Sequence, residues 1–250
     1  VPVHMVNFGG NLSVNALFKS ARFRREAARL AARLAASCAP AVDPYQAAAC
    51  VWSCDRIRQA GGLAILCHPH WIAGCTYNVP AALNEWLFAH HPFDAFELIG
   101  GFHRHELESN QLQVAWYHDQ RARGRCTPVI GASDAHGCER GELFGWYYSI
   151  VFAAAPEQLL ESVRQGYSVA IEAVPGDTVR AHGPYRLTRY ALFLARAVMP
   201  MPDELCLEAG RLLLEHASGD AQAGPDLARL SGRCGRLYER LWHSSARPSA

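Results

Sequence analysis

Three short apolar runs alternate with helical segments in the first half of the chain. They cover residues 63–67, 93–99 and 127–131, and each is expected to form a strand. The run at 63–67 is continuously apolar, as expected for a strand buried on both faces. Strands that alternate with helices in this way are typical of parallel β-α units. The sequence therefore predicts an α/β fold built around a parallel sheet.

The rest of the chain divides into two parts at Gly183. Before it, we expect three further strands, at residues 3–8, 146–152 and 167–173. Beyond it, the pattern is helical with no strand. We therefore expect one domain over residues 1–182 and a helical extension over residues 183–250. The predicted helices cover residues 15–37, 44–60, 80–89, 106–123, 156–165, 185–199, 203–217 and 225–242.

Composition limits the class of protein. The chain has 250 residues, half of them hydrophobic, and a formal net charge of +1, which gives no support to a nucleic-acid-binding role. No apolar run reaches the roughly 20 residues that span a bilayer, and no signal peptide pattern is present. The nine cysteines include one close pair, Cys50 and Cys54, and Cys67 fits a small buried hydrophobe. We expect a reduced, cytoplasmic protein without a membrane partner.

Polar side chains follow two of the predicted parallel strands. His68 follows the strand at 63–67, and Asp134 and His136 follow the strand at 127–131. Residues two apart in an extended chain point to the same side, so Asp134 and His136 can face one point. Because the carboxyl ends of parallel strands meet at one edge, we expect all three to converge there as metal ligands.

Five further residues near this edge are candidates for substrate binding. Glu97 interrupts an apolar strand, so it is either a site carboxylate or a paired core charge. His103 lies in a loop after that strand and is either functional or simply solvated. His70 follows the strand that ends before His68. Arg104 and Arg140 flank the site and can hold a phosphate, although arginine is common throughout this chain.

Three segments together resemble the polymerase and histidinol phosphatase (PHP) superfamily. Residues 62–69 (GLAILCHP) resemble its glycine-to-His-Pro strand, and residues 131–137 (GASDAHG) resemble its last metal motif. Residues 93–98 (FDAFEL) resemble the strand between them. The resemblance implies a distorted (β/α)7 barrel, of which this chain would form the C-terminal part. It also implies two or three divalent metal ions, commonly zinc, manganese or iron, and phosphoester hydrolysis.

The resemblance also assigns roles to individual residues. His68, Asp134 and His136 match metal ligands of the family, and Asp134 could also accept the proton of the attacking water. His4, in the segment VHMVN, resembles a ligand in a further strand motif. The motifs that precede this strand in the family have no counterpart in the chain. We therefore expect the sequence to be a fragment of a longer protein.

The sequence thus favours a metal-dependent phosphoesterase that acts on a small phosphorylated substrate. The alternative is a catalytically inactive PHP-like module that serves as an interaction scaffold. A hydrolase of amide or lactone bonds is a third interpretation, but it normally needs a modified lysine on a central strand. Lys19 is the only lysine, and it lies on a predicted helix. The sequence leaves the oligomeric state open.

Overall fold

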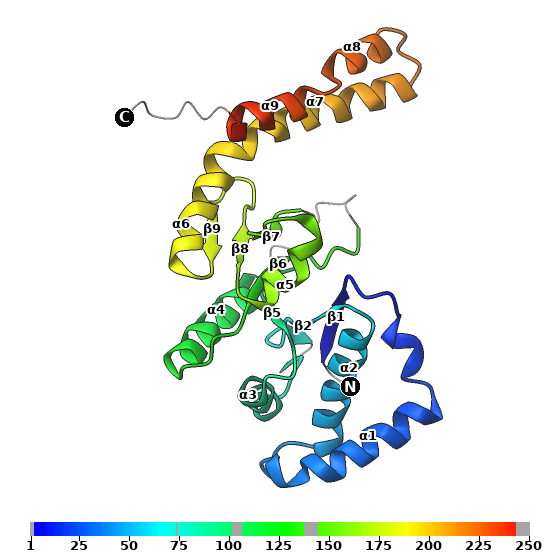
Figure 1. Ribbon diagram of the computed structural model, residues 1–250, viewed down its shortest axis with the longest axis vertical. Helices are drawn as coiled ribbons and strands as arrows, with labels where there is room; N and C mark the ends of the chain where they lie inside the picture. Colours follow the sequence, from blue (N-terminus) through cyan, green and yellow to red (C-terminus); the bar gives the residue numbers. More distant parts are fainter. Residues whose placement is uncertain (1–2, 74, 102–106, 138–144, 244–250) are drawn as a thin grey trace. The chain divides into compact units, whose positions relative to one another are not determined.

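A computed structural model describes residues 3–73, 75–101, 107–137 and 145–243 (Figure 1). The chain forms two compact units, Val1–Ala191 and Leu192–Ala250. The first unit contains all the described strands and the candidate site, and the described part of the second is helical.

The main sheet of the first unit has four strands in the order β1-β2-β5-β6. The strands β2, β5 and β6 are parallel, as the sequence predicts, whereas β1 pairs antiparallel with β2. Their bounds are β1 His4–Phe8, β2 Leu63–Cys67, β5 Ala95–Gly100 and β6 Val129–Ala132.

A second sheet has three antiparallel strands in the order β7-β8-β9. The strands β7 (Tyr147–Val151) and β8 (Ser168–Glu172) confirm two predicted strands. The third strand, β9 (Arg180–His182), was not predicted, because three residues carry too little periodicity. A small hairpin of β3 (Ile72–Ala73) and β4 (Thr76–Tyr77) follows β2 and also escaped prediction.

The predicted barrel is wrong. The four-stranded sheet does not close on itself, and β1 lies at its edge with β2 as its one neighbour among the described strands. The later strands pair antiparallel in a separate sheet and do not continue the parallel series. Apolar runs predict that a strand exists, but they do not determine its direction or its neighbours.

Helices cover one face of the main sheet (Figure 1). One of the two longest, α2, begins at Pro44, where the Asp43 carboxylate accepts a hydrogen bond from the backbone N–H of Tyr45. It ends before Gly61, whose φ of 79° is the left-handed conformation common after helices. The helices of this unit are η1 Val14–Leu17, α1 Ala21–Leu34, η2 Ala35–Ser37, α2 Pro44–Gln59, α3 Ala81–His90, α4 Leu107–Ala122, η4 Pro156–Gln158, α5 Leu159–Arg164 and α6 Tyr185–Phe193.

The alternation of side chains along the central strands builds two apolar clusters. Leu66 and Phe96 point to the helical face, where they join residues of α2 and α3 in the larger cluster. Ile65 and Ile130 point to the opposite face and pack with Val163 of α5. Both faces of the central strands are thus buried, as expected for a parallel sheet.

The second unit contains a π-helical turn, η5 (Leu194–Val198), and the helices α7 (Pro200–Ala217), α8 (Ala223–Leu230) and α9 (Arg233–His243). The helix predicted over 225–242 is in fact two, because Gly232 has a φ of 72°. In the described part of the chain, each helix is too short or too polar to cross a membrane.

The compact units divide at Leu192 rather than at the predicted Gly183. The reason is α6, whose residue Ala191 is fully buried. The ring of Tyr190 also stacks on Phe152, with centroids 5.7 Å apart, so most of this helix belongs to the first unit.

Candidate metal centre

The carboxyl ends of β2, β5 and β6 surround a cavity of about 140 Å³. The first residue of β1, His4, pairs with the last residue of β2 and so reaches the same edge of the sheet. The cavity therefore brings together all four side chains that the sequence predicted as metal ligands. It is lined by His4, His68, Trp71, Gly100, Gly101, Ser109, Asn110, Asp134 and His136.

The imidazoles of His4 and His68 are hydrogen-bonded to each other in the lining of this cavity. Their nearest atoms, Nδ1 of His4 and Nε2 of His68, are 2.8 Å apart. The two rings are nearly perpendicular, with an interplanar angle of 84°. The indole of Trp71 lies about 6 Å from both rings (6.2 and 6.1 Å between centroids) and forms a wall beside them.

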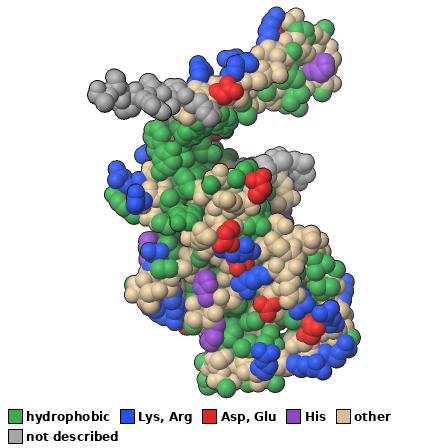
Figure 2. All heavy atoms as spheres, viewed as in Figure 1, with side chains coloured by type: hydrophobic (Ala, Val, Ile, Leu, Met, Phe, Trp, Pro, Cys, Tyr) green, Lys and Arg blue, Asp and Glu red, His purple; other side chains and the backbone are tan. Residues whose placement is uncertain are grey.

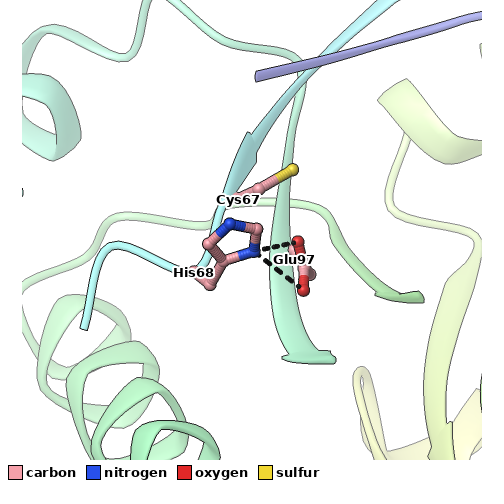
Figure 3. Close-up of side chains that lie close together, drawn as sticks. All are labelled: Cys67, His68 and Glu97. Carbon is pink, nitrogen blue, oxygen red and sulfur yellow. Dashed lines mark hydrogen bonds and ion pairs between the residues drawn. The ribbon is translucent and has the colours of Figure 1, made fainter. Parts of the chain in front are cut away.

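Glu97 contacts the ring nitrogen of His68 that lies opposite the one facing His4. Its Oε2 lies 3.1 Å from Nδ1 of His68, and its side chain is almost fully buried in β5 (Figure 3). Because a carboxylate accepts hydrogen bonds, we assign the proton of a neutral His68 to Nδ1. The lone pair of Nε2 then accepts a hydrogen bond from Nδ1–H of His4. A carboxylate that fixes the far nitrogen of a histidine in this way is typical of metal-binding histidines.

Cys67 lies beside this pair. The ligand atoms of Cys67, His68 and Glu97 lie within 4.8 Å of one another, so these three residues form a second possible donor set (Figure 3). Burial, followed by the charge of Glu97, raises the pKa of the Cys67 thiol well above its ordinary value. A thiol must lose its proton to bind a metal ion, so Cys67 is the least prepared donor of the three.

The backbone is strained at two residues of the cavity. His68 has a φ of 26° and Asp134 a φ of 49°. Positive φ values disfavour residues with a Cβ atom, and they persist only where the surrounding structure enforces them. Strain of this kind gathers at functional sites, so its presence on two strand ends that face one cavity supports a ligand-binding role.

Burial holds the pKa of His4 below its ordinary value of 6.5, and the neighbouring His68 adds to this effect. Asp134 and Glu97 oppose it with their negative charges. The direction of the shift means that His4 is mainly neutral at pH 7. A neutral imidazole offers the lone pair that a metal ion requires.

The absence of a side chain at Gly100 leaves room for the Glu97 carboxylate. A Cβ atom on Gly100 would lie 1.8 Å from Oε1 of Glu97 and 2.7 Å from the carbonyl oxygen of Ala132. Asn110 of α4 fixes this glycine with two hydrogen bonds, one to its N–H and one to its carbonyl, each 2.9 Å long. The end of β5 is therefore built around the carboxylate.

We expect Gly100→Ala to displace the Glu97 carboxylate from His68 and to destabilise the protein by about 1–3 kcal/mol through overpacking. Urea denaturation measures this loss. Gly210→Ala is the matched control, since a Cβ at Gly210 meets nothing within 4 Å. A Gly100→Ala variant as stable as this control would show that the carboxylate has another position available.

Of the five residues that the sequence predicted for substrate binding, the two that the structure describes do not line the cavity. Glu97 is on the far side of His68 rather than on the cavity wall, so it is not placed to contact a substrate. His70 is absent from the lining, and its ring packs against Tyr77 and Trp116. The remaining three candidates, His103, Arg104 and Arg140, lie outside the described residues.

Several residues of the site were not found from the sequence. Trp71 and Asn110 line the cavity although no motif contains them. Cys67 was interpreted as a small hydrophobe, and its burial confirms that environment, but it also neighbours Glu97. The position of Cys67 at the end of β2, directly before His68, is the sequence feature that could have indicated that Cys67 belongs to the site.

Comparisons of the chain with protein-family models, with curated proteins and with solved structures find no match.

Proposed function

We propose that this chain binds a divalent cation in the cavity through His4, His68, Asp134 and His136 and hydrolyses the phosphoester of a small substrate. The observation that carries the proposal is the 2.8 Å approach of the His4 and His68 nitrogens, with Glu97 bonded to the opposite nitrogen of His68. The resemblance of the strand-end motifs to the PHP superfamily supports the reaction type.

The side chains of the cavity are of the types that bind the proposed cation. The nitrogens of His4 and His68 that share a hydrogen bond would bind the ion after that proton is lost, and Asp134 and His136 line the same cavity. These two would have to move toward the imidazoles, since among the described residues the one set of three donors within 4.8 Å is Cys67, His68 and Glu97. Imidazole and carboxylate ligands together suit zinc, manganese or iron. The resemblance favours two or three ions, and the four side chains named here provide donors for one of them.

The residues of the cavity have separate tasks in the proposed reaction. A bound divalent ion would polarise a phosphoryl oxygen and lower the pKa of a water molecule to about 7. The Asp134 carboxylate would accept the proton of the attacking water. Glu97 would keep His68 in the tautomer that binds through Nε2. Trp71 would exclude bulk water from one side of the reacting group.

A catalytically inactive module is the second candidate. Four protein ligands complete the coordination of a structural zinc ion, whereas a catalytic site keeps one position open. The cavity provides four such side chains, so a closed site that only stabilises the sheet edge is consistent with the same residues. Such a module would act as an interaction scaffold.

Metal analysis and a phosphatase assay together test these alternatives. The protein is loaded with zinc, manganese or iron, dialysed, and assayed for bound metal and for hydrolysis of a simple aryl phosphate. We expect Asp134→Ala combined with His136→Ala to abolish hydrolysis, and the exposed residue His216 serves as the control for a histidine-to-alanine change. Bound metal without hydrolysis in the wild type would favour the inactive module. Undiminished hydrolysis in the double variant would contradict the proposed site.

We also propose that the protein acts in the cytoplasm. The cysteines of the described segments all carry free thiols. Thiols persist in reducing compartments, and this supports the proposal.

A further inference from the structure

A second cleft lies between α1 and α2, away from the metal-site lining. Its volume is about 440 Å³, and it shares no residue with the cavity described above. Two arginines line it, Arg22 from α1 and Arg56 from α2, together with the indole of Trp52. Leu12 and Leu17 provide apolar surface in the same cleft.

Arg56 is held in place but has an unused donor. Its guanidinium carbon lies 5.4 Å from the centre of the Trp52 ring, which is a cation–π contact. Its Nε is buried, and no hydrogen-bond partner for it exists among the described residues. Buried donors on charged groups normally have a partner. Because Nε itself has no exposed surface, a ligand in the cleft would bond to the terminal N–H groups of the Arg56 guanidinium.

Arg22 lines the same cleft as Arg56 and also has N–H donors without a described partner. Its Nε donates to Oε1 of Glu26 at 2.8 Å, and Oε2 of Glu26 accepts from Nε1 of Trp52 at 2.7 Å. These two hydrogen bonds lower the pKa of Glu26 and keep it ionised. A guanidinium has five N–H donors, so one bond to Glu26 leaves Arg22 able to bind a further anion. The two arginines and one carboxylate leave a positive charge at the cleft.

The surface of α1 increases this positive charge. Between residues 9 and 42 the sequence has six basic side chains and one acidic one, Glu26, in a chain whose net charge is only +1. Basic side chains gather over this helix in Figure 2. A local concentration of charge attracts anions and raises their concentration near the cleft. The basic residues are Lys19, Arg22, Arg24, Arg25, Arg29 and Arg33, all exposed.

We propose that this cleft binds a phosphate group, either as free phosphate or as part of a small phosphorylated molecule. Arginine matches the oxygens of a phosphate with parallel hydrogen bonds, and two arginines from facing helices can hold one group between them. Leu12 and Leu17 would contact the organic part of such a molecule. The site is independent of the proposed metal centre and of its reaction.

Calorimetric titration of chelator-treated protein tests the proposal, since without metal the strand-end cavity does not compete. The probes are inorganic phosphate and phenyl phosphate. We expect saturable binding that weakens about 10- to 100-fold in Arg56→Gln and in Arg22→Gln. Arg29→Gln, which removes the same charge from α1 outside the cleft, should bind within about twofold of the wild type.

Two results separate the possible ligands, and two overturn the proposal. Tighter binding of phenyl phosphate would identify a phosphorylated organic molecule, and equal binding would identify free phosphate. The absence of saturable binding, or an equal loss in Arg29→Gln, would show that no defined site exists. The side chain of Arg22 is 65% exposed, so Arg22→Gln keeps the test valid even if Arg56→Gln unfolds.

Discussion

Glu97→Ala is expected to weaken zinc binding about 10- to 100-fold, the usual cost of removing a group that orients a metal-binding histidine. Without the carboxylate, the proton of His68 is no longer fixed on Nδ1, and the ring loses the contact of 3.1 Å that sets its direction. Glu97→Gln retains an acceptor oxygen without the charge and should lose less. Competition with a metal-sensitive chelator measures the affinity of each variant.

Glu172→Ala is the matched control for this change. Glu172 is also a buried carboxylate on a strand, but its partner is Arg180, and neither residue lines the cavity. Wild-type affinity in a folded Glu97→Ala protein would mean that His68 is positioned by other contacts. A loss far beyond about 100-fold would instead indicate that Glu97 binds the ion directly with Cys67 and His68.

Much of the site was predictable because strand ends obey simple geometry. His68, Asp134 and His136 follow parallel strands, and parallel strands present their carboxyl ends at one edge. His4 reaches this edge for a different reason, since β1 runs antiparallel and its first residue meets the end of β2. The sequence predicts the residue but not this direction.

The remaining features depend on packing that periodicity does not report. The positive φ values of His68 and Asp134 occur where the chain leaves their strands. Asp and His adopt positive φ more often than most residues do, but most of them do not, so the residue type alone does not predict it. The sequence left Glu97 as either a site carboxylate or a paired core charge. In the structure Glu97 is buried and paired, and its partner His68 lies on the cavity wall.

The closed barrel could not be excluded from the sequence for a similar reason. The run at residues 146–152 predicts a strand, and the strand exists as β7. Its pairing with β8 is antiparallel, which no local pattern distinguishes from a parallel pairing. Sheet closure depends on these long-range pairings. The motifs at the strand ends therefore predicted where the candidate site lies, but the sequence did not predict the architecture of the sheets.

Asp94→Ala should destabilise the first unit by about 2 kcal/mol, because it removes the buried acid of a partly exposed ion pair together with its hydrogen bond to the backbone. The side chain of Asp94 is 8% exposed, and its Oδ1 lies 2.9 Å from Nε of Arg58 on α2. Its Oδ2 accepts a hydrogen bond of 2.8 Å from the backbone of Ala64 on β2, and Arg164 of α5 lies 3.6 Å away. One carboxylate thus joins two helices to the start of two strands. Chemical denaturation of chelator-treated protein measures the loss without a contribution from bound metal.

Asp55→Ala tests whether burial is the cause. Asp55 contacts the same arginine, Arg58, at 3.7 Å, but its side chain is 52% exposed. Exposed ion pairs contribute at most about 1 kcal/mol, so this variant should remain close to the wild type. Equal losses in both variants would assign the effect to the Arg58 charge alone. A loss of stability confined to Asp94→Ala would show that Asp94 helps to hold the helices on the sheet. Glu97, in the same FDAFEL segment, would then have a different role, which is to orient His68.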